Sequence, residues 1–240
     1  SPHLKDFRER FRVNGKMMPR RFVVEFVELN KAIFEEIQPS FFEMTVALAF
    51  EWFKIQKVDI AIIETGLGGR LDSTNVVEPE LSLITNIDFD HTDLLGDTIE
   101  KIAFEKAGII KKKTPVIVSE FNPNSASVFR KKAEEMSSEI IFASKEITWS
   151  KSELKIHSGS IHLHLKGKYR SKSIELFSPL TGGYQKQNLK GVWLSAINLR
   201  LLGWNITDSA IQKGVEKVVI NTQLMGRWQQ LSSKPDVFCD

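Results

Sequence analysis

The sequence contains very little cysteine: Cys239 is the one cysteine in 240 residues. An intrachain disulfide is therefore excluded, and such sparse usage fits a reducing compartment, so we expect a cytoplasmic protein. We expect no membrane partner, because no apolar run approaches the ~18 residues that a spanning helix needs. The net charge is only +3, which gives no reason to expect nucleic acid as a partner.

Several catalytic motifs are also missing. The phosphate-binding loop G-x-x-x-x-G-K-[ST] does not occur, so an ATP site built from these residues alone would lack the backbone cradle for the phosphates. The glycine-rich stretch Gly66–Arg70 reads G-L-G-G-R and departs from G-x-G-x-x-G. This argues against a Rossmann dinucleotide site and indicates a tight turn. No Ser-His-Asp or Cys-His arrangement stands out.

Short β-branched runs alternate with helical patterns in the first part of the chain. The runs that read as buried parallel strands are Val58–Ile63, Leu81–Ile87, Thr114–Ser119 and Ile140–Ala143. The spacing of apolar residues predicts helices at 20–37, 41–56, 98–110 and 123–137. This order predicts an α/β fold in which a mostly parallel sheet is flanked by helices, with helix 41–56 packed on the sheet.

The second part of the chain has a different pattern. Alternating residues predict a small antiparallel β patch over 146–180, followed by helices at 187–202 and 207–218 and a strand over 235–240. No linker is long enough to separate domains, so we expect one domain over 1–240. Because the chain lacks an initial Met and stops within an expected strand, we expect it to be a piece of a longer protein.

Polar residues directly follow two of the predicted strands. Glu64 follows the run Val58–Ile63, and His91 lies in the acidic stretch after Leu81–Ile87. Since ligands bind beyond the carboxyl ends of parallel strands, both side chains are expected at one rim of the sheet. A carboxylate and an imidazole there can form a sparse Mg²⁺ site that serves nucleotide phosphates. The alternative is a salt bridge at a strand end and an ordinary surface histidine.

Other polar residues allow more than one interpretation. Arg70 and Asp72 can pair with each other or face a substrate. Arg227 can bind phosphate through its planar guanidinium or lie at the surface. Ser40 and Glu43 have the spacing of a capping box at the start of helix 41–56.

Seven motifs together resemble one family. In chain order they are S-P-H-L…R-E-R-F-R-V-N-G, P-S-F-F-E-M-T, I-E-T-G-L-G-G-R-L-D-S-T-N, T-N-I-D-F-D-H-T, L-G-D-T-I-E-K-I-A-F-E-K-A-G-I-I-K, G-Y-Q-K-Q-N and G-R-W-Q. From Ser1 to Asp240 the sequence resembles the central ATP-binding domain of the folylpolyglutamate synthase/dihydrofolate synthase family, which is part of the Mur ligase superfamily. The resemblance implies a fold like the Mur ligase central domain.

The resemblance also implies roles for individual residues. The implied Mg²⁺ ligands are Ser1, Glu64 and His91, and the implied ATP contacts are Asn188, Arg227 and Asp240. Lys106, by pattern an ordinary solvated helix lysine, matches the lysine that carries a carbamate in the family. With His91 and Arg227 it makes up the implied catalytic set. The implied pterin pocket contains Ser40, Phe41, Phe42, Glu43, Arg70, Leu71 and Asp72.

The activity implied by the resemblance is ATP-dependent amide formation between the carboxylate of dihydropteroate or folate and glutamate, through an acyl phosphate. ATP, the pterin and glutamate are the implied small-molecule partners, with Mg²⁺ as cofactor, and we expect a monomer. The family's phosphate loop precedes S-P-H-L and its C-terminal domain follows Asp240, so this chain by itself is expected to be inactive. Two alternatives stay open: a ligase for cell-wall precursors, and a folate-binding or scaffold module without a phosphate loop.

Overall fold

The structure, a computed structural model, describes residues 3–89, 91–151, 161–167, 173–180, 182–226 and 229–239. For residues 149–151 and 161–166 it describes the backbone but not the side chains.

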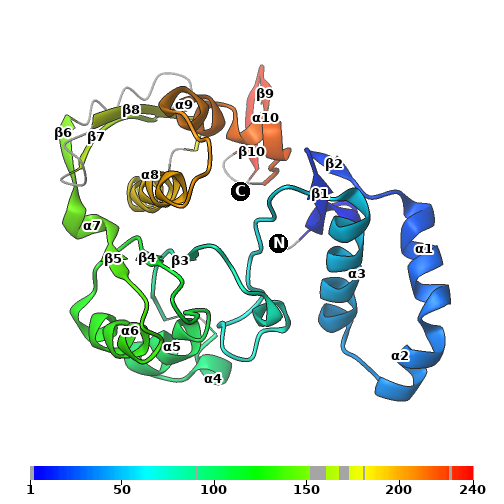
Figure 1. Ribbon diagram of the computed structural model, residues 1–240. Coiled ribbons are helices and arrows are strands. Elements are labelled where there is room, and N and C mark those ends of the chain that lie inside the picture. The colour runs from blue at the N-terminus through cyan, green and yellow to red at the C-terminus, as the bar shows by residue number, and fades with distance from the viewer. Residues whose placement is uncertain are drawn as a thin grey trace.

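The predicted parallel sheet is present, with three strands in the order β3, β4, β5 (Figure 1). The strands are β3 (Ser82–Ile84), β4 (Val116–Val118) and β5 (Ile140–Phe142). Ile117 of the central strand pairs with Leu83 on one side and with Ile141 on the other. All three residues of β4 are almost fully buried, as the apolar pattern predicts for a strand covered on both faces.

Three helices flank this sheet: α5 (Ile99–Ala107), α6 (Pro123–Glu135) and α8 (Gln185–Leu201). On one face, Val118 packs in a core cluster with Phe129 of α6 and with apolar residues of α5. On the other face, Ile117 packs in a second cluster with Trp193 of α8. The fold is therefore a helix–sheet–helix sandwich, and the predicted α/β class is confirmed.

The predicted antiparallel patch is also present. It consists of β6 (Ile147–Lys151), β7 (Ile161–Gly167) and β8 (Ser173–Ser178). Ile174 and Leu176 of β8 join the α8 cluster, together with Ile211 of α9 (Asp208–Glu216). The chain continues into α10 (Val218–Thr222) and the hairpin of β9 (Gln229–Ser233) and β10 (Asp236–Cys239). The short helix α7 (Ala143–Glu146) links β5 to β6.

The N-terminal part of the chain forms a separate small core. Its elements are the 3₁₀ turn η1 (Phe7–Arg10), the hairpin β1 (Arg12–Val13) and β2 (Lys16–Met17), and the helices α1 (Arg20–Leu29), α2 (Lys31–Ile37) and α3 (Phe41–Gln56). The helix predicted over 20–37 is divided at Asn30, whose amide donates to the Phe26 carbonyl. Leu48 of α3 packs with Phe11 and Met18. The prediction that helix 41–56 packs on the sheet is therefore wrong, because its buried face meets the hairpin and α1 instead.

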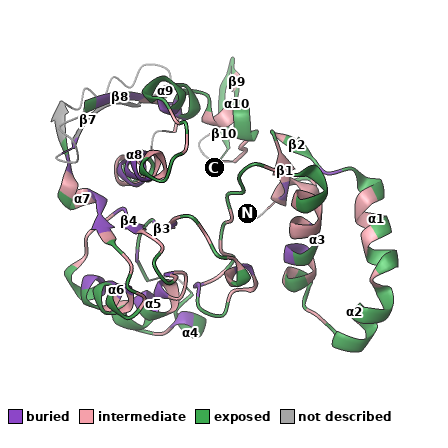
Figure 2. Ribbon diagram, in the orientation of Figure 1, coloured by how far each residue is buried: buried purple, intermediate pink, exposed green. Residues whose placement is uncertain are grey.

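The run Val58–Ile63, predicted as a buried strand, is not a strand in the structure. Ile60 is half exposed and Ile62 is 93% exposed. In Figure 2 the connection that leaves α3 is drawn mainly in the colour of exposed residues. Within the described residues, no strand pairs with this run. The prediction fails because a β-branched run forms a strand through packing and pairing with neighbours, and not through backbone preference alone. Among the described residues, no helix has the length and apolar character needed to cross a membrane.

Candidate functional site

A cavity of about 520 Å³ lies beside the glycine-rich turn, and we call it the turn cavity. One wall is the face of α3 that carries Glu43, Val46 and Phe50. The other wall runs from Arg70 through Asp72 into the 3₁₀ turn η2 (Ser73–Val76). Four of the seven predicted pterin-pocket residues therefore line one cavity: Glu43, Arg70, Leu71 and Asp72.

Phe42, a further predicted pocket residue, packs against the glycine-rich turn itself. A Cβ atom added to Gly66 would overlap the tip of the Phe42 ring. Glycine at this position therefore allows the first turn of α3 to approach the turn closely. Phe41 lies elsewhere: its ring is 59% exposed and contacts the Phe7 ring at a centroid distance of 5.3 Å. Phe41 is not among the residues that line the turn cavity.

The Asp72 carboxylate holds the turn together. One oxygen accepts a hydrogen bond from the Leu67 backbone N–H at 2.8 Å, and the other accepts from the Thr74 N–H at 2.9 Å. Asp72 is thus the N-cap of η2, a position where Asp is strongly preferred. Both of its oxygens are occupied within the loop, so Asp72 shapes the cavity wall.

The pairing of Arg70 with Asp72, one of the two interpretations above, is wrong. The Arg70 guanidinium donates to the Glu105 carboxylate of α5 at 2.9 Å and lies 5.4 Å from the centre of the Phe104 ring. A Cβ atom added to Gly108 would overlap the Arg70 backbone. The F-E-K-A-G motif therefore positions Arg70 in three ways: Glu105 is its ion-pair partner, Phe104 provides an aromatic ring beside the guanidinium, and Gly108 leaves space for its backbone.

Asn75 was missed in the sequence, although it ends the L-D-S-T-N motif. Its side-chain amide donates to the carbonyls of Arg70 and Gly108, at 3.2 Å and 3.1 Å. The backbone carbonyl of Asn75 accepts a hydrogen bond from the Lys111 ammonium. Asn75 therefore joins the turn to the end of α5, and it also lines the turn cavity.

The predicted capping box at the start of α3 is present. The Ser40 hydroxyl accepts from the Glu43 N–H at 3.2 Å, and the Glu43 carboxylate accepts from the Ser40 N–H at 2.6 Å. Hydrogen bonds from Ser40 lower the pKa of the Glu43 carboxyl group, and the Ser40 side chain contributes more to this shift than the Ser40 backbone does. Ser40 and Glu43 therefore have a defined structural role, and Glu43 also faces the turn cavity.

Two of the three residues predicted to bind Mg²⁺, Glu64 and His91, lie at exposed positions. Glu64 ends the exposed run 58–63, and His91 is the N-cap of the short helix α4 (Thr92–Leu95), with φ of 49°. Lys106 lies half-buried in the last turn of α5. The described residues contain no group of three acidic, histidine or cysteine side chains arranged to hold a metal ion. A single carboxylate such as Glu64 still fits Mg²⁺, which is often bound by one or two carboxylates together with substrate phosphates.

The residues predicted to bind ATP are only partly described. Asn188 lies near the start of α8, where its amide donates to the Gln185 side chain at 3.2 Å. Ser1, Arg227 and Asp240 lie outside the described residues. These site assignments therefore stay predictions.

Polar groups that the sequence did not indicate are buried near the end of β4 and in α8, where Ser119 lies against Gly191. The Ser119 hydroxyl and the Gln187 side-chain oxygen are buried without a hydrogen-bond partner among the described residues. Burial lowers the pKa of the nearby Lys190, while the Glu120 carboxylate acts in the opposite direction. Gln187 belongs to the G-Y-Q-K-Q-N motif, but no motif marks Ser119 or Lys190.

The chain matches known proteins over its whole length. The Mur ligase middle domain family matches residues 21–196. A dihydrofolate synthase/folylpolyglutamate synthase of Bacillus subtilis (strain 168) is 35% identical over 253 residues, which cover 100% of this chain and 56% of that protein. The chain thus spans little more than half the length of this relative.

Solved structures agree with the sequence comparison. A structure described as an FPGS-AMPPCP complex matches with a TM-score of 0.90 at 30% identity, over 100% of this chain and 60% of the other. E. coli FolC in complex with DHPP and ADP matches with a TM-score of 0.81 at 31% identity, over 100% and 53%. The chain therefore belongs to the Mur ligase family, in which it carries the middle domain and is similar to the folylpolyglutamate and dihydrofolate synthases.

Proposed function

We propose that the protein containing this chain is an ATP-dependent ligase that joins the carboxylate of dihydropteroate or folate to the amine of glutamate. One observation carries the proposal: the whole chain is similar to FPGS bound to AMPPCP, with a TM-score of 0.90 at 30% identity. The turn cavity supports this proposal, because four of the residues predicted for the pterin pocket line this single cavity. Its volume of about 520 Å³ lies within the usual range for small-molecule sites.

A carboxylate is a poor electrophile, so the reaction requires activation. In the proposed reaction, a carboxylate oxygen of the pterin substrate attacks the γ-phosphorus of ATP, and ADP leaves. The amine of glutamate then attacks the acyl carbon, and inorganic phosphate leaves as the amide forms and the amine loses its protons. Anions meet in both steps, so cationic groups are needed to stabilise the moving charge.

The roles proposed for individual residues of this chain rest on the family resemblance and on the geometry of the turn cavity. The turn cavity binds the flat pterin between α3 and the loop held by Asp72, and Arg70 binds the anionic part of the substrate. Asn188, Arg227 and Asp240 contact ATP, and Arg227 stabilises phosphate charge. Glu64, His91 and Ser1 would hold Mg²⁺, which when bound neutralises phosphate charge, and a carbamate on Lys106 would support it. We further propose a cytoplasmic monomer acting on small molecules.

The test is an assay of the protein as its gene encodes it, with ATP, glutamate and dihydropteroate. We expect equal amounts of ADP and of the new amide, detected by mass spectrometry, and loss of both when the pterin is omitted. ADP release without amide would contradict the proposal. Turnover only with a nucleotide-linked peptide precursor of the cell wall would support the alternative ligase, and binding of folate without any turnover would support a binding module.

A further inference from the structure

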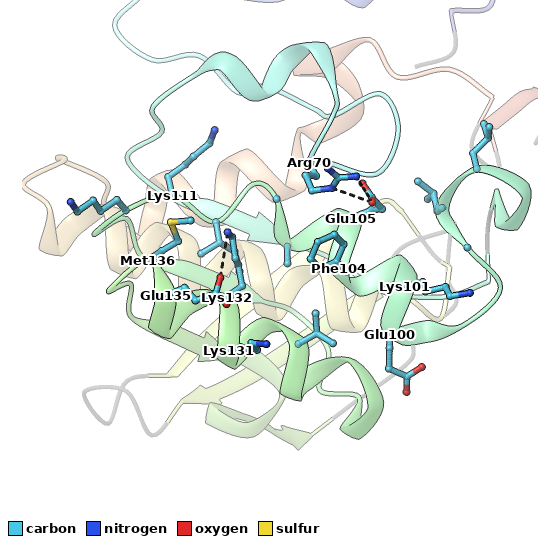
Figure 3. Close-up of a pocket in the computed structure, with 18 residues that line it drawn as sticks. Arg70, Glu100, Lys101, Phe104, Glu105, Lys111, Lys131, Lys132, Glu135 and Met136 are labelled. Carbon is cyan, nitrogen blue, oxygen red and sulfur yellow. Dashed lines mark hydrogen bonds and ion pairs between the residues drawn. The ribbon is translucent and has the colours of Figure 1, made fainter.

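The Arg70 side chain lies where two cavities meet. It lines the turn cavity and also a second cavity, of about 760 Å³, between α5 and α6 (Figure 3). The side chain is 43% exposed, so a ligand can reach it. Figure 3 shows that it points toward Glu105 and lies beside the Phe104 ring. The direction of the guanidinium therefore determines which contacts it can offer to a ligand in the turn cavity.

Glu105 holds Arg70 by one edge of the guanidinium. Nε and Nη2 of Arg70 both donate to the same Glu105 carboxylate oxygen, at 3.2 Å and 2.9 Å. The Nη1 group of Arg70 forms no hydrogen bond or ion pair with another residue in the part of the chain that the structure describes. Because a guanidinium carries five N–H donors in one fixed plane, holding one edge leaves the other donors available in a defined direction.

The backbone around Arg70 is fixed to α5 by contacts that do not involve the Glu105 carboxylate. The Arg70 N–H donates to the Glu105 backbone carbonyl at 2.8 Å, and the Asn75 amide binds the carbonyls of Arg70 and Gly108. A Cβ atom added to Gly69 would lie 2.9 Å from the Glu105 carbonyl oxygen, so the turn rests directly on the helix backbone. The path of the loop is therefore set by the backbone, and the Glu105 carboxylate sets the direction of the guanidinium.

We propose that Glu105 is a positioning residue: it orders Arg70 so that the free donors of the guanidinium meet the carboxylate of the substrate. This inference rests on the proposed function, because it concerns the substrate that we assign to the turn cavity. The charge of Glu105 by itself opposes the binding of an anion, since it offsets the charge of Arg70. Its hydrogen bonds favour binding, because a guanidinium that is already ordered loses less conformational freedom when the substrate arrives. The two effects predict opposite results when the carboxylate is removed.

The first test is calorimetric titration of dihydropteroate into the protein as its gene encodes it and into three variants. Glu105→Ala removes the acceptor, whereas Glu105→Gln keeps an oxygen that accepts the guanidinium hydrogen bonds and removes the charge. Glu100→Ala, at an exposed carboxylate in the first turn of the same helix, is the matched control. We expect Glu105→Ala to bind dihydropteroate about tenfold more weakly than the wild type, and the other two variants to stay within about threefold of it. Unchanged or tighter binding by Glu105→Ala would overturn the proposal.

The second test repeats the titrations with the carboxamide of dihydropteroate, in which a neutral amide replaces the carboxylate. A residue that only supports the shape of the cavity affects both ligands alike, whereas one that aims Arg70 at the carboxylate affects the anion alone. We therefore expect Glu105→Ala to weaken binding of the carboxamide by less than about twofold.

The outcomes separate this inference from the proposed function. Equal weakening of both ligands by Glu105→Ala, in a protein whose wild type makes the amide from ATP, glutamate and dihydropteroate, would overturn the positioning role alone. A wild type that binds neither ligand and shows no ligase turnover would overturn the proposed function, and this inference with it.

Discussion

Two apolar runs with similar sequences have very different surroundings in this chain. In β4, Ile117 is fully buried against α8, its neighbours Val116 and Val118 are buried against the α5–α6 layer, and the strand pairs on both sides. In the run 58–63, Ile62 is 93% exposed and no described strand pairs with it. Both runs are rich in Val and Ile. The difference between them shows that an apolar, β-branched run forms a buried strand only where other parts of the fold pair with it and cover it.

The contrast between buried and exposed positions also separates residues expected to stabilise the fold from residues expected to take part in the reaction. Ile117 lies in a core that fixes the sheet, whereas Glu64 ends the exposed run and His91 precedes the short helix α4. Substitutions in the first region are therefore expected to change stability. Substitutions in the second are expected to change activity.

The largest expected change in stability is at Ile117. Replacing Ile117 by Ala leaves a cavity between the sheet and α8, and we expect a loss of about 2–5 kcal/mol in the free energy of unfolding. Replacing the exposed Ile62 by Ala should change it by less than about 0.5 kcal/mol. Urea denaturation of the two variants measures both values. Equal losses would mean that the two runs are buried alike.

The next effect concerns activity. Glu64→Ala and His91→Ala should each abolish ligase turnover, a loss of more than about a hundredfold, in the protein as its gene encodes it. Their melting temperatures should stay close to that of the wild type, because both side chains are exposed. Glu80→Ala, at another exposed carboxylate, is the control. A large fall in melting temperature would instead show that Glu64 or His91 is structural.

A smaller effect is expected where the turn meets α5. An Ala at Gly108 would overlap the Arg70 backbone, so we expect a loss of about 1–3 kcal/mol. Gly214 in α9 is a control, because a Cβ atom there meets nothing within 4 Å. Gly214→Ala should stabilise the chain by up to about 1 kcal/mol through helix propensity. Thermal unfolding compares the two, and stabilisation by both substitutions would contradict the close approach at Gly108.

The smallest effect is the pH dependence of the capping box. Because hydrogen bonds from Ser40 lower the pKa of Glu43 in the folded state, its contribution to stability is complete above the usual Glu pKa of about 4.3. It is lost as the pH falls through the lower pKa of the folded state. The stability difference between wild type and Glu43→Gln should therefore shrink in acid. A difference that is constant with pH would show that the Glu43 charge has no role in the cap.

Local sequence patterns predicted local structure well. The parallel strands β3 to β5, the helices α3, α5 and α6, and the capping box of Ser40 and Glu43 all depend on residues close in sequence, and all are present. The partner of Arg70 could not be predicted in the same way, because Glu105 is 35 residues away and Asp72 is a nearer carboxylate. The packing of α3 on the hairpin likewise depends on distant residues.

In the candidate site too, features that depend on residues close in sequence were predicted better than features that depend on distant residues. The motifs around Arg70 and Glu43 indicated residues that line one cavity. The motif that spans residues 95–111 supplies one wall of the cavity between α5 and α6, whereas the residues of α6 that line the other wall belong to no motif. Only the folded chain brings Lys131 and Lys132 of α6 to the same cavity as Phe104 of α5.

The most direct test of the pterin site on which the proposed ligase depends is calorimetric titration of dihydropteroate into the protein as its gene encodes it and into its Leu71→Asp variant. Leu71 lines the turn cavity and is 78% exposed, so the substitution adds charge to the cavity without disturbing the core. We predict saturable binding of one dihydropteroate per wild-type chain, lost in Leu71→Asp and retained in Leu202→Asp, a control outside the cavity. Absence of binding to the wild type, or equal binding by Leu71→Asp, would contradict the assignment of the turn cavity to the pterin.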